Sequence, residues 1–267
     1  MTMRLPTNLA RLWLLAAAGF VIISGAHGEI TTRPSAPNSG ISYASADVRA
    51  LQADDSVNPG MLWVARGEAL WNEAAGDGRK SCAQCHDAAA VSMKGAATRY
   101  PRVGTDAKKL VNLEGRINLC RVNHQRSTSL ALESIEMLAL TTYVAHQSRG
   151  MSKSIAINDG NRPHFEHGAS IYSKRMGQMN LACAHCHDQH AGRTLLTEKI
   201  SEGHPNAYPI YRLEWQGVGS LHRRFRSCMT GVRAAPFAYG GEEYLSLELY
   251  LAWRASGLAV ETPGVRR

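Results

Sequence analysis

The clearest helical pattern in the sequence lies near its C-terminal end. Two acidic residues, Glu242 and Glu243, begin this stretch and Arg254 ends it, which is the charge order that a helix dipole favours. The pattern predicts an amphipathic helix with Gly257 at its C′ position. Its apolar positions recur at the 3.6-residue spacing of an α-helix: Tyr244, Leu247, Leu251 and Ala255.

The same pattern occurs a second time in the first half of the chain. Residues 138–144 (LALTTYV) align with residues 245–251 (LSLELYL) after a shift of 107, which makes Gly150 the counterpart of Gly257. Each half therefore predicts an N-terminal helix, a long loop-rich region and a C-terminal helix, with few β-alternating runs. Toward the N-terminus of each half, a shift of 101 aligns four more pairs: Gly67 with Gly168, Leu70 with Ile171, Trp71 with Tyr172, and Gly76 with Gly177.

The N-terminus has a different apolar pattern. Arg4 and Arg11 precede an uninterrupted apolar run, residues 12–24, and small residues follow at 26–28. This arrangement predicts a cleaved secretory signal over residues 1–28, because the run is too short and too rich in Ala and Gly for a membrane anchor. No later stretch approaches the length of a membrane span. We therefore expect the mature protein to lie in the periplasm and to contain no membrane-spanning segment.

Two copies of a five-residue motif add chemistry to the repeat: CAQCH at 82–86 and CAHCH at 183–187. In the C-x-x-C-H pattern both cysteines attach a haem c covalently and the histidine ligates its iron. A zinc site remains an alternative for the second motif, where His185, His187 and His190 are close in sequence. The motifs predict two haem c groups, attached at Cys82 and Cys85 and at Cys183 and Cys186, with His86 and His187 as iron ligands.

Motifs and repeat together predict a mainly α fold of two tandem cytochrome c-like domains related by internal repeat. About 240 residues remain after signal cleavage, enough for two haem-sized domains. We expect an N-terminal extension over residues 29–58 that lies across the first domain. The first domain would span 59–151 and the second 163–267. The polar stretch 152–162 would separate them, and Pro163 would open the next helix.

The net charge says little about partners. It is +8 for the whole chain and +6 without the two signal arginines. Four propionates on two haems would bring the assembled protein close to neutral, so the excess of basic residues does not indicate nucleic-acid binding. The positions of the arginines are more informative than their number.

Two cysteines remain outside the motifs, one in each half. Cys120 and Cys228 follow the motif histidines by 34 and 41 residues, and an arginine precedes each by four, Arg116 and Arg224. They could form a disulfide with each other. They could be the distal iron ligands, as thiolates that lower the reduction potential. Or they could be inert, with the distal ligand among Met93, Met137, Met176, Met179, Met229, His124 and His222.

Arginines distinguish the second of these cysteines. A guanidinium lowers the pKa of a nearby thiol and binds oxyanions through two N–H groups. Pairing with haem propionates would also explain why arginines occur here. Cys120 has only Arg116 and Arg121 nearby. If one site is catalytic, we therefore expect it to be the second, because four arginines lie close to Cys228 in sequence: Arg223, Arg224, Arg226 and Arg233.

The segment around Cys228, residues 208–233, resembles the SoxA subunits of the SoxAX cytochromes of bacterial sulfur oxidation. The C-terminal residues 247–258 and 263–267 are similar to the same family, and the resemblance covers essentially all of the mature chain. Some members lack the first haem. This chain keeps both motifs and Cys120, so it resembles the dihaem type.

The resemblance implies an L-cysteine S-thiosulfotransferase. Thiosulfate would be joined oxidatively to a cysteine of the carrier protein SoxY, within SoxYZ. Two electrons would pass to a monohaem partner subunit, SoxX, in a heterodimer, and then to a small cytochrome c acceptor. Cys228 would be the distal ligand of the second haem and the nucleophile, found as a persulfide in the family, and Arg224 would hold thiosulfate. His187 would be the proximal ligand. His86 and Cys120 would ligate a non-catalytic first haem.

Two alternatives to this function remain at the level of sequence. One is a dihaem electron-transfer cytochrome, whose distal ligands would be Met or His. The other is a thiosulfate dehydrogenase that joins two thiosulfates into tetrathionate and needs no carrier protein.

Overall fold

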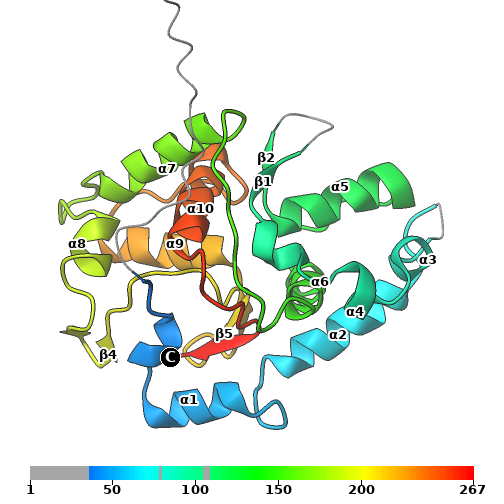
Figure 1. The fold of residues 1–267 in the computed structure, drawn as a ribbon, viewed down its shortest axis with the longest axis horizontal. Coiled ribbons are helices and arrows are strands. Elements are labelled where there is room, and N and C mark those ends of the chain that lie inside the picture. Colours follow the sequence, from blue (N-terminus) through cyan, green and yellow to red (C-terminus); the bar gives the residue numbers. More distant parts are fainter. Residues whose placement is uncertain (1–35, 78–79, 105–108) are drawn as a thin grey trace, which may run out of the picture.

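The computed structural model describes residues 36–77, 80–104 and 109–267, and two helical domains stand side by side in it (Figure 1). The predicted signal, residues 1–28, lies outside the described residues. Within those residues, no helix has both the length and the apolar character needed to cross a membrane.

The first domain is built from helices and one small hairpin, in which β1 and β2 pair antiparallel. Its core joins residues of the first and last helices, including Val64, Trp71 and Val144. Its elements are α2 (Met61–Asn72), α3 (Ala83–His86), α4 (Ala89–Ser92), the 3-10 helix η2 (Ala96–Arg99), β1 (Arg102–Val103), β2 (Leu110–Val111), α5 (Leu113–Gln125) and α6 (Ile135–His146).

The second domain repeats this order of helices and adds strands. Its three-stranded sheet has the order β6-β5-β7, with β5 antiparallel to β6 and parallel to the C-terminal strand β7. Pro163 lies in the first turn of α7, as predicted. The elements are α7 (Arg162–Ser173), α8 (Cys183–His187), β3 (Thr194–Leu195), β4 (Glu198–Lys199), β5 (Ile210–Arg212), β6 (Gly217–Gly219), α9 (Leu221–Gly231), α10 (Glu242–Arg254) and β7 (Gly264–Arg266).

The predicted repeat is confirmed where the first and last helices of each domain cross. A Cβ atom on Gly67 would lie 2.2 Å from the carbonyl oxygen of Ala139, and one on Gly168 would lie 2.0 Å from that of Ser246. The 107-residue shift that aligns the C-terminal helices also aligns Ala139 with Ser246. Glycine at both positions therefore allows the backbones of α2 and α6, and of α7 and α10, to touch.

The C-terminal helix has its predicted buried face, since Tyr244, Leu247, Leu251 and Ala255 are at most 5% exposed. The predicted C′ glycines are wrong. α6 ends at His146 and α10 at Arg254, and both glycines lie beyond the C′ position, with φ of +81° at Gly150 and +91° at Gly257. The chain turns on past each helix, and these glycines instead join its two halves: Gly150 donates to the carbonyl of Val260 and Gly257 to that of Lys153, each at 2.9 Å.

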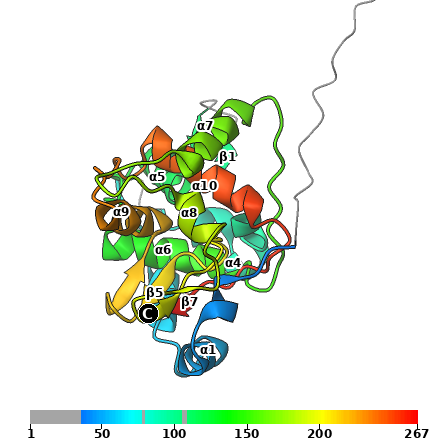
Figure 2. The same ribbon diagram turned by 90° about the vertical axis from the view of Figure 1, so that its left-hand side faces the viewer.

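The N-terminal segment lies against the second domain, so its expected place across the first domain is wrong. It contains the 3-10 helix η1 (Gly40–Tyr43) and α1 (Ala46–Ala53), and both contact β7. Figures 1 and 2 show α1 at the end of the molecule where β7 lies. The reason is polar complementarity, because Asn38, Tyr43 and Gln52 find the carboxylates of Glu202 and Glu261 there.

A cavity of about 50 Å³ lies between the two domains, and three charged side chains line it. Glu114 comes from α5 and Glu248 from α10, and Lys153 comes from the connection between the domains. The ammonium of Lys153 donates to the carbonyls of Ala97 at 3.1 Å and Tyr100 at 3.4 Å. Burial, together with the negative charge of Glu248, raises the pKa of Glu114 to about 7.

This raised pKa predicts that the Glu114 carboxyl destabilises the protein above pH 7. The native state binds the proton more tightly than the unfolded chain, so stability falls as pH rises from about 4.5 to 7. Glu114→Gln is expected to raise the free energy of unfolding at pH 7.5 by roughly 1–3 kcal/mol and to leave it unchanged at pH 4. Urea titrations of the holoprotein at both pH values measure this. Glu166→Gln, on the exposed side of α7, is the control, and an equal gain in that variant would contradict the prediction.

Candidate functional site

The two C-x-x-C-H motifs lie on the short helices α3 and α8, each beside the first helix of its domain. The indole N–H of Trp71 donates to the carbonyl of Asp87 at 3.1 Å. The hydroxyl of Tyr172 donates to the carboxylate of Asp188 at 2.7 Å. The aligned pair Trp71 and Tyr172 thus holds the residue that follows each motif histidine, which fixes where the histidine can point.

His187 is oriented from behind by the loop that follows α8. Its Nδ1 lies 2.7 Å from the carbonyl oxygen of Ser201, so Nδ1 donates and Nε2 remains available as a ligand. Gly203, with φ of +75°, packs against the ring so closely that a Cβ would lie 3.0 Å from its Cγ and Nδ1. This is the arrangement that a proximal haem ligand needs, because it sets both the tautomer and the plane of the imidazole.

Cys228, on α9, meets this histidine in the same pocket. Its thiol lies within hydrogen-bond range of the His187 imidazole and interacts electrostatically with Cys183 and Cys186. All six cysteines of the chain are free, so Cys120 and Cys228 form no disulfide. An imidazole and a thiol that face each other beside two attachment cysteines match the donors of a His/Cys-ligated haem c, so the residues fit this cofactor.

Two arginines surround Cys228 with positive charge. Burial by itself would raise the pKa of this thiol, but Arg224, the contact with His187 and Arg212 outweigh it and lower the pKa to about 7. The thiolate in turn raises the pKa of Arg224. Sequence reasoning identified Arg224 but missed Arg212, which lies on β5 and donates to Glu214 at 2.9 Å. No spacing relates this strand residue to the motif, so only the fold reveals it.

The other three arginines near Cys228 in sequence are engaged elsewhere. Arg223 lies over the ring of Trp215 at 4.4 Å. Arg226 donates to the carbonyl of Phe237 at 2.8 Å and lies over Tyr239. Arg233 is exposed and reaches Gln178 at 3.4 Å. Of the four arginines close to Cys228 in sequence, only Arg224 therefore acts on its thiol, together with Arg212 from the sheet.

The first motif also has a cysteine from a later helix close to it. Burial raises the pKa of the Cys82 thiol, and Cys120 lies close enough to add to this effect. The side-chain amide of Gln125 points to the Cys82 sulfur at 3.7 Å. The ring of His86 lies 5.8 Å from that of Trp71. The structure thus brings Cys120 to the first motif, as α9 brings Cys228 to the second.

Several of the alternative ligands are held by other partners. The sulfur of Met229 accepts from the Tyr244 hydroxyl at 3.4 Å, and His222 lies 3.1 Å from Glu248. His185 and His190, which kept a zinc site open, both use Nδ1 in backbone contacts, at 2.8 Å and 2.6 Å. Among the described parts of the chain, no group of His, Cys, Asp or Glu could hold a metal ion by itself.

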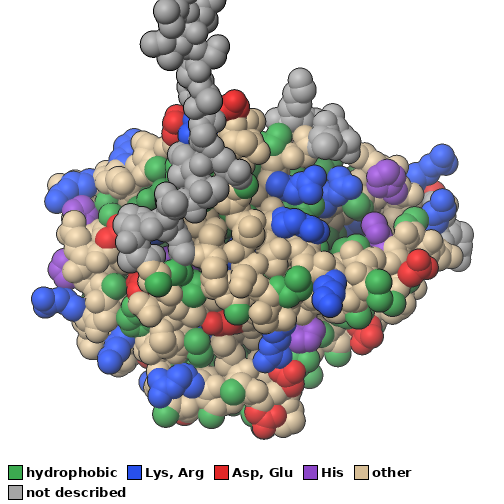
Figure 3. Space-filling model, in the orientation of Figure 1, with side chains coloured by type: hydrophobic (Ala, Val, Ile, Leu, Met, Phe, Trp, Pro, Cys, Tyr) green, Lys and Arg blue, Asp and Glu red, His purple; other side chains and the backbone are tan. Residues whose placement is uncertain are grey.

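Figure 3 shows charged side chains of both signs over one face of the molecule. Basic ones gather most densely at the upper right, over the first domain as oriented in Figure 1. Positive charge is therefore not confined to the second domain. The feature that distinguishes the second site is the placement of Arg224 and Arg212 beside a partly buried thiol.

A helical domain that carries a C-x-x-C-H motif on a short helix beside its first helix, with a further cysteine near the motif cysteines, defines a c-type cytochrome, and the chain contains this domain twice. It belongs to the SoxA/TsdA cytochrome c domain family, whose model matches residues 66–152 and 167–260. Membership in this family shows haem c binding.

Curated relatives of the chain are named L-cysteine S-thiosulfotransferase subunit SoxA. The protein from Pseudaminobacter salicylatoxidans is 39% identical over 89% of this chain and 86% of its own length. That from Rhodovulum sulfidophilum is 36% identical with the same coverage. The crystal structure of SoxXA from P. pantotrophus matches with a TM-score of 0.84 and 35% identity, covering 86% of this chain and 87% of the matched chain.

Proposed function

We propose that this protein is the dihaem SoxA-type subunit of an L-cysteine S-thiosulfotransferase, with Cys228 as the sulfur nucleophile. The observation that carries the proposal is the placement of a partly buried thiol between the second haem motif and two arginines. The names of the curated relatives support the reaction class. Each motif supplies a complete attachment set, which supports two haem c groups.

The reaction joins two sulfur atoms that both carry negative charge. The Cys228 thiolate forms a bond with the terminal sulfur of thiosulfate, and two electrons leave. The carrier's thiolate then attacks this terminal sulfur, takes over the S–SO₃ group and releases Cys228 as a thiolate. Overall, one carrier thiol and one thiosulfate give the S-thiosulfonate of the carrier, one proton and two electrons. When bound, haem supplies an iron that accepts electrons one at a time.

Arg224 and Arg212 make this approach possible. Two like charges at contact distance repel strongly where water is partly excluded. The guanidinium of Arg224 interacts electrostatically with Cys228 and can bind two sulfonate oxygens at once. Arg212 adds positive charge from the sheet, and its ion pair with Glu214 fixes its position. Together they bind the substrate and keep the cysteine as a thiolate.

The partners follow from the likeness to SoxXA. The 0.84 TM-score over most of the chain supports a heterodimer with a monohaem SoxX subunit. We further infer that SoxYZ is the carrier, that a small cytochrome c accepts the electrons and that the protein acts in the periplasm. The N-terminal charge and apolar pattern supports this location.

The function is tested by supplying thiosulfate and an electron acceptor with and without the carrier. We expect acceptor reduction that depends on the carrier, and a carrier cysteine that gains the mass of a thiosulfate group. Tetrathionate formed at the same rate without the carrier would instead identify a thiosulfate dehydrogenase. Haems that exchange electrons with the acceptor cytochrome but leave thiosulfate unoxidised would indicate a plain electron-transfer cytochrome.

Arg224→Ala is expected to raise the KM for thiosulfate and lower kcat/KM by about 100-fold, because a charge-assisted bidentate contact is lost. Steady-state kinetics against thiosulfate concentration measure both constants. Arg233→Ala is the matched control, since it removes an exposed arginine five residues after Cys228. Unchanged kinetics in the Arg224 variant would exclude this residue from the substrate site.

A further inference from the structure

The loop after the second haem motif is held by the N-terminal segment of the chain. The carboxylate of Glu202 accepts three hydrogen bonds from this segment, whose contacting residues lie 159 and 164 positions earlier. The donors are the backbone N–H of Asn38 at 3.0 Å, the side-chain amide of Asn38 at 2.7 Å and the hydroxyl of Tyr43 at 2.9 Å. Nε2 of His204 contacts it at 3.0 Å. One carboxylate thus ties residues 36–43 to the loop.

The same loop touches the proximal histidine on both sides of Glu202. Ser201, just before it, accepts from Nδ1 of His187 at 2.7 Å. Gly203, just after it, lies against the face of the same ring. Because these two residues flank Glu202 directly, a shift of its side chain moves both contacts to the imidazole.

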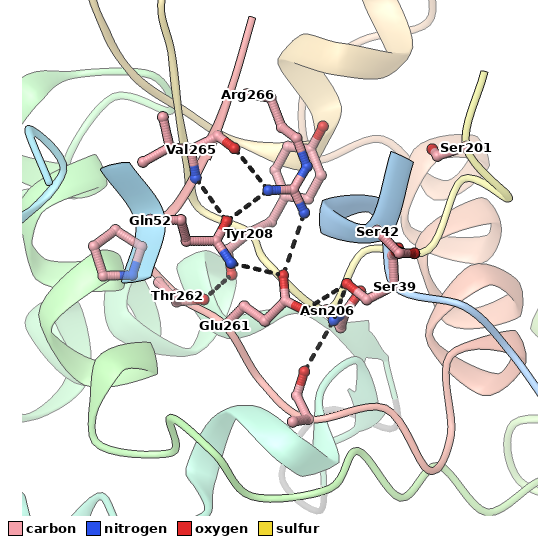
Figure 4. A network of polar contacts seen from close by, with 12 residues as sticks. Ser39, Ser42, Gln52, Ser201, Asn206, Tyr208, Glu261, Thr262, Val265 and Arg266 are labelled. Atoms are coloured by element: carbon pink, nitrogen blue, oxygen red, sulfur yellow. Dashed lines mark hydrogen bonds and ion pairs between the residues drawn. The ribbon is translucent and has the colours of Figure 1, made fainter. Parts of the chain in front are cut away.

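A second set of contacts anchors the N-terminal segment independently (Figure 4). Ser39 donates to Glu261 at 2.5 Å and accepts from Asn206 at 3.1 Å. Gln52 donates to Glu261 at 3.2 Å and accepts from Arg266 at 2.6 Å. Docking of the segment therefore does not depend on Glu202 alone, so the two sets of contacts can be separated by mutation.

We propose that Glu202, held by Asn38 and Tyr43, is a positioning residue for the second haem, because it fixes the Ser201 carbonyl against His187. The inference rests on the proposed ligation by His187. A donated Nδ1–H makes the opposite nitrogen a stronger ligand, which stabilises ferric iron and lowers the reduction potential. The N-terminal segment thereby belongs to the second haem site although it precedes the first domain.

The contact is permanent across the working pH range. Burial would raise the pKa of Glu202, but its contacts with Asn38, Tyr43 and His204 outweigh this and lower the pKa to about 2. The carboxylate therefore stays ionised and keeps accepting these hydrogen bonds.

The test compares the two haems within one protein. Glu202→Gln and Tyr43→Phe are purified as holoprotein, and the midpoint potential and EPR signal of each haem are recorded. We expect the potential of the second haem to rise and its g-values to shift, more in Glu202→Gln than in Tyr43→Phe, while the first haem stays unchanged. Ser39→Ala loosens the same segment without touching Glu202, and we expect it to leave both haems unchanged.

A double-mutant cycle separates positioning from a general loss of packing. If Asn38 acts through Glu202, the variant Asn38→Ala/Glu202→Ala shifts the second haem no further than Glu202→Ala alone. An unchanged potential in Glu202→Gln, or an equal shift in Ser39→Ala, overturns the positioning role. A His187→Ala holoprotein whose second haem keeps the wild-type potential and EPR signal would overturn the ligation by His187 as well, so the two failures are distinguishable.

Discussion

Replacing Cys228 with Ser is expected to abolish thiosulfate-dependent turnover, by at least about 1000-fold, while both haems stay attached. A hydroxyl is a far weaker nucleophile than a thiolate, and it cannot form a sulfur–sulfur bond. Attachment is expected to survive because the cysteines that we propose as thioether residues, Cys183 and Cys186, lie on α8 rather than α9. The assay is carrier-dependent acceptor reduction, with haem content taken from the mass of the protein.

Cys120→Ser is the matched control at the first motif. It should change the spectrum of the first haem yet keep most of the activity, because the thiol whose pKa Arg224 and Arg212 help to lower to about 7 is that of Cys228. An equal loss in both variants would mean that the two sites act together. Persistence of the low-spin thiolate EPR signal from the second haem in Cys228→Ser would show that another residue ligates the iron.

The fold was predictable from sequence where it depends on local pattern or on the repeat. The spacing of Tyr244, Leu247 and Leu251 predicted the buried face of α10. The alignment of Gly67 with Gly168 predicted equivalent positions, and both are sites where two helix backbones meet. Such features are predictable because short-range periodicity and the spacing of the haem motifs leave few alternative local structures.

Features that depend on long-range pairing were not predictable. Arg212 reaches the thiol because β5 pairs with the C-terminal strand β7, and nothing in the spacing of Arg212 indicates this. The N-terminal segment lies on the second domain because Glu202 and Glu261 accept its donors, contacts between residues more than 150 positions apart. Gly150 and Gly257 were read as helix caps because both lie just beyond apolar helical patterns, whereas they join the two domains.

Gly168→Ala is expected to destabilise the second domain by roughly 3–5 kcal/mol. The new Cβ would lie 2.0 Å from the carbonyl oxygen of Ser246, and backbone cannot yield as a flexible side chain can. The helices α7 and α10 must therefore move apart, and with them the walls of the second haem pocket. Gly67→Ala makes the equivalent change between α2 and α6.

The repeat turns this into a test of domain assignment. Since we propose that both haems are attached covalently, we expect disturbed packing to show as a changed low-spin signal rather than as lost haem. We expect Gly168→Ala to disturb the second haem and catalysis, and Gly67→Ala to disturb the first haem with catalysis largely retained.

Gly231→Ala is the control, because its Cβ would meet nothing within 4 Å. We expect this variant to change the free energy of unfolding by no more than about 1 kcal/mol, toward greater stability. Urea unfolding and EPR measure both effects. Equal disturbance of both haems by either variant would mean that the two domains unfold as one unit, bound together by the contacts of Gly150 and Gly257.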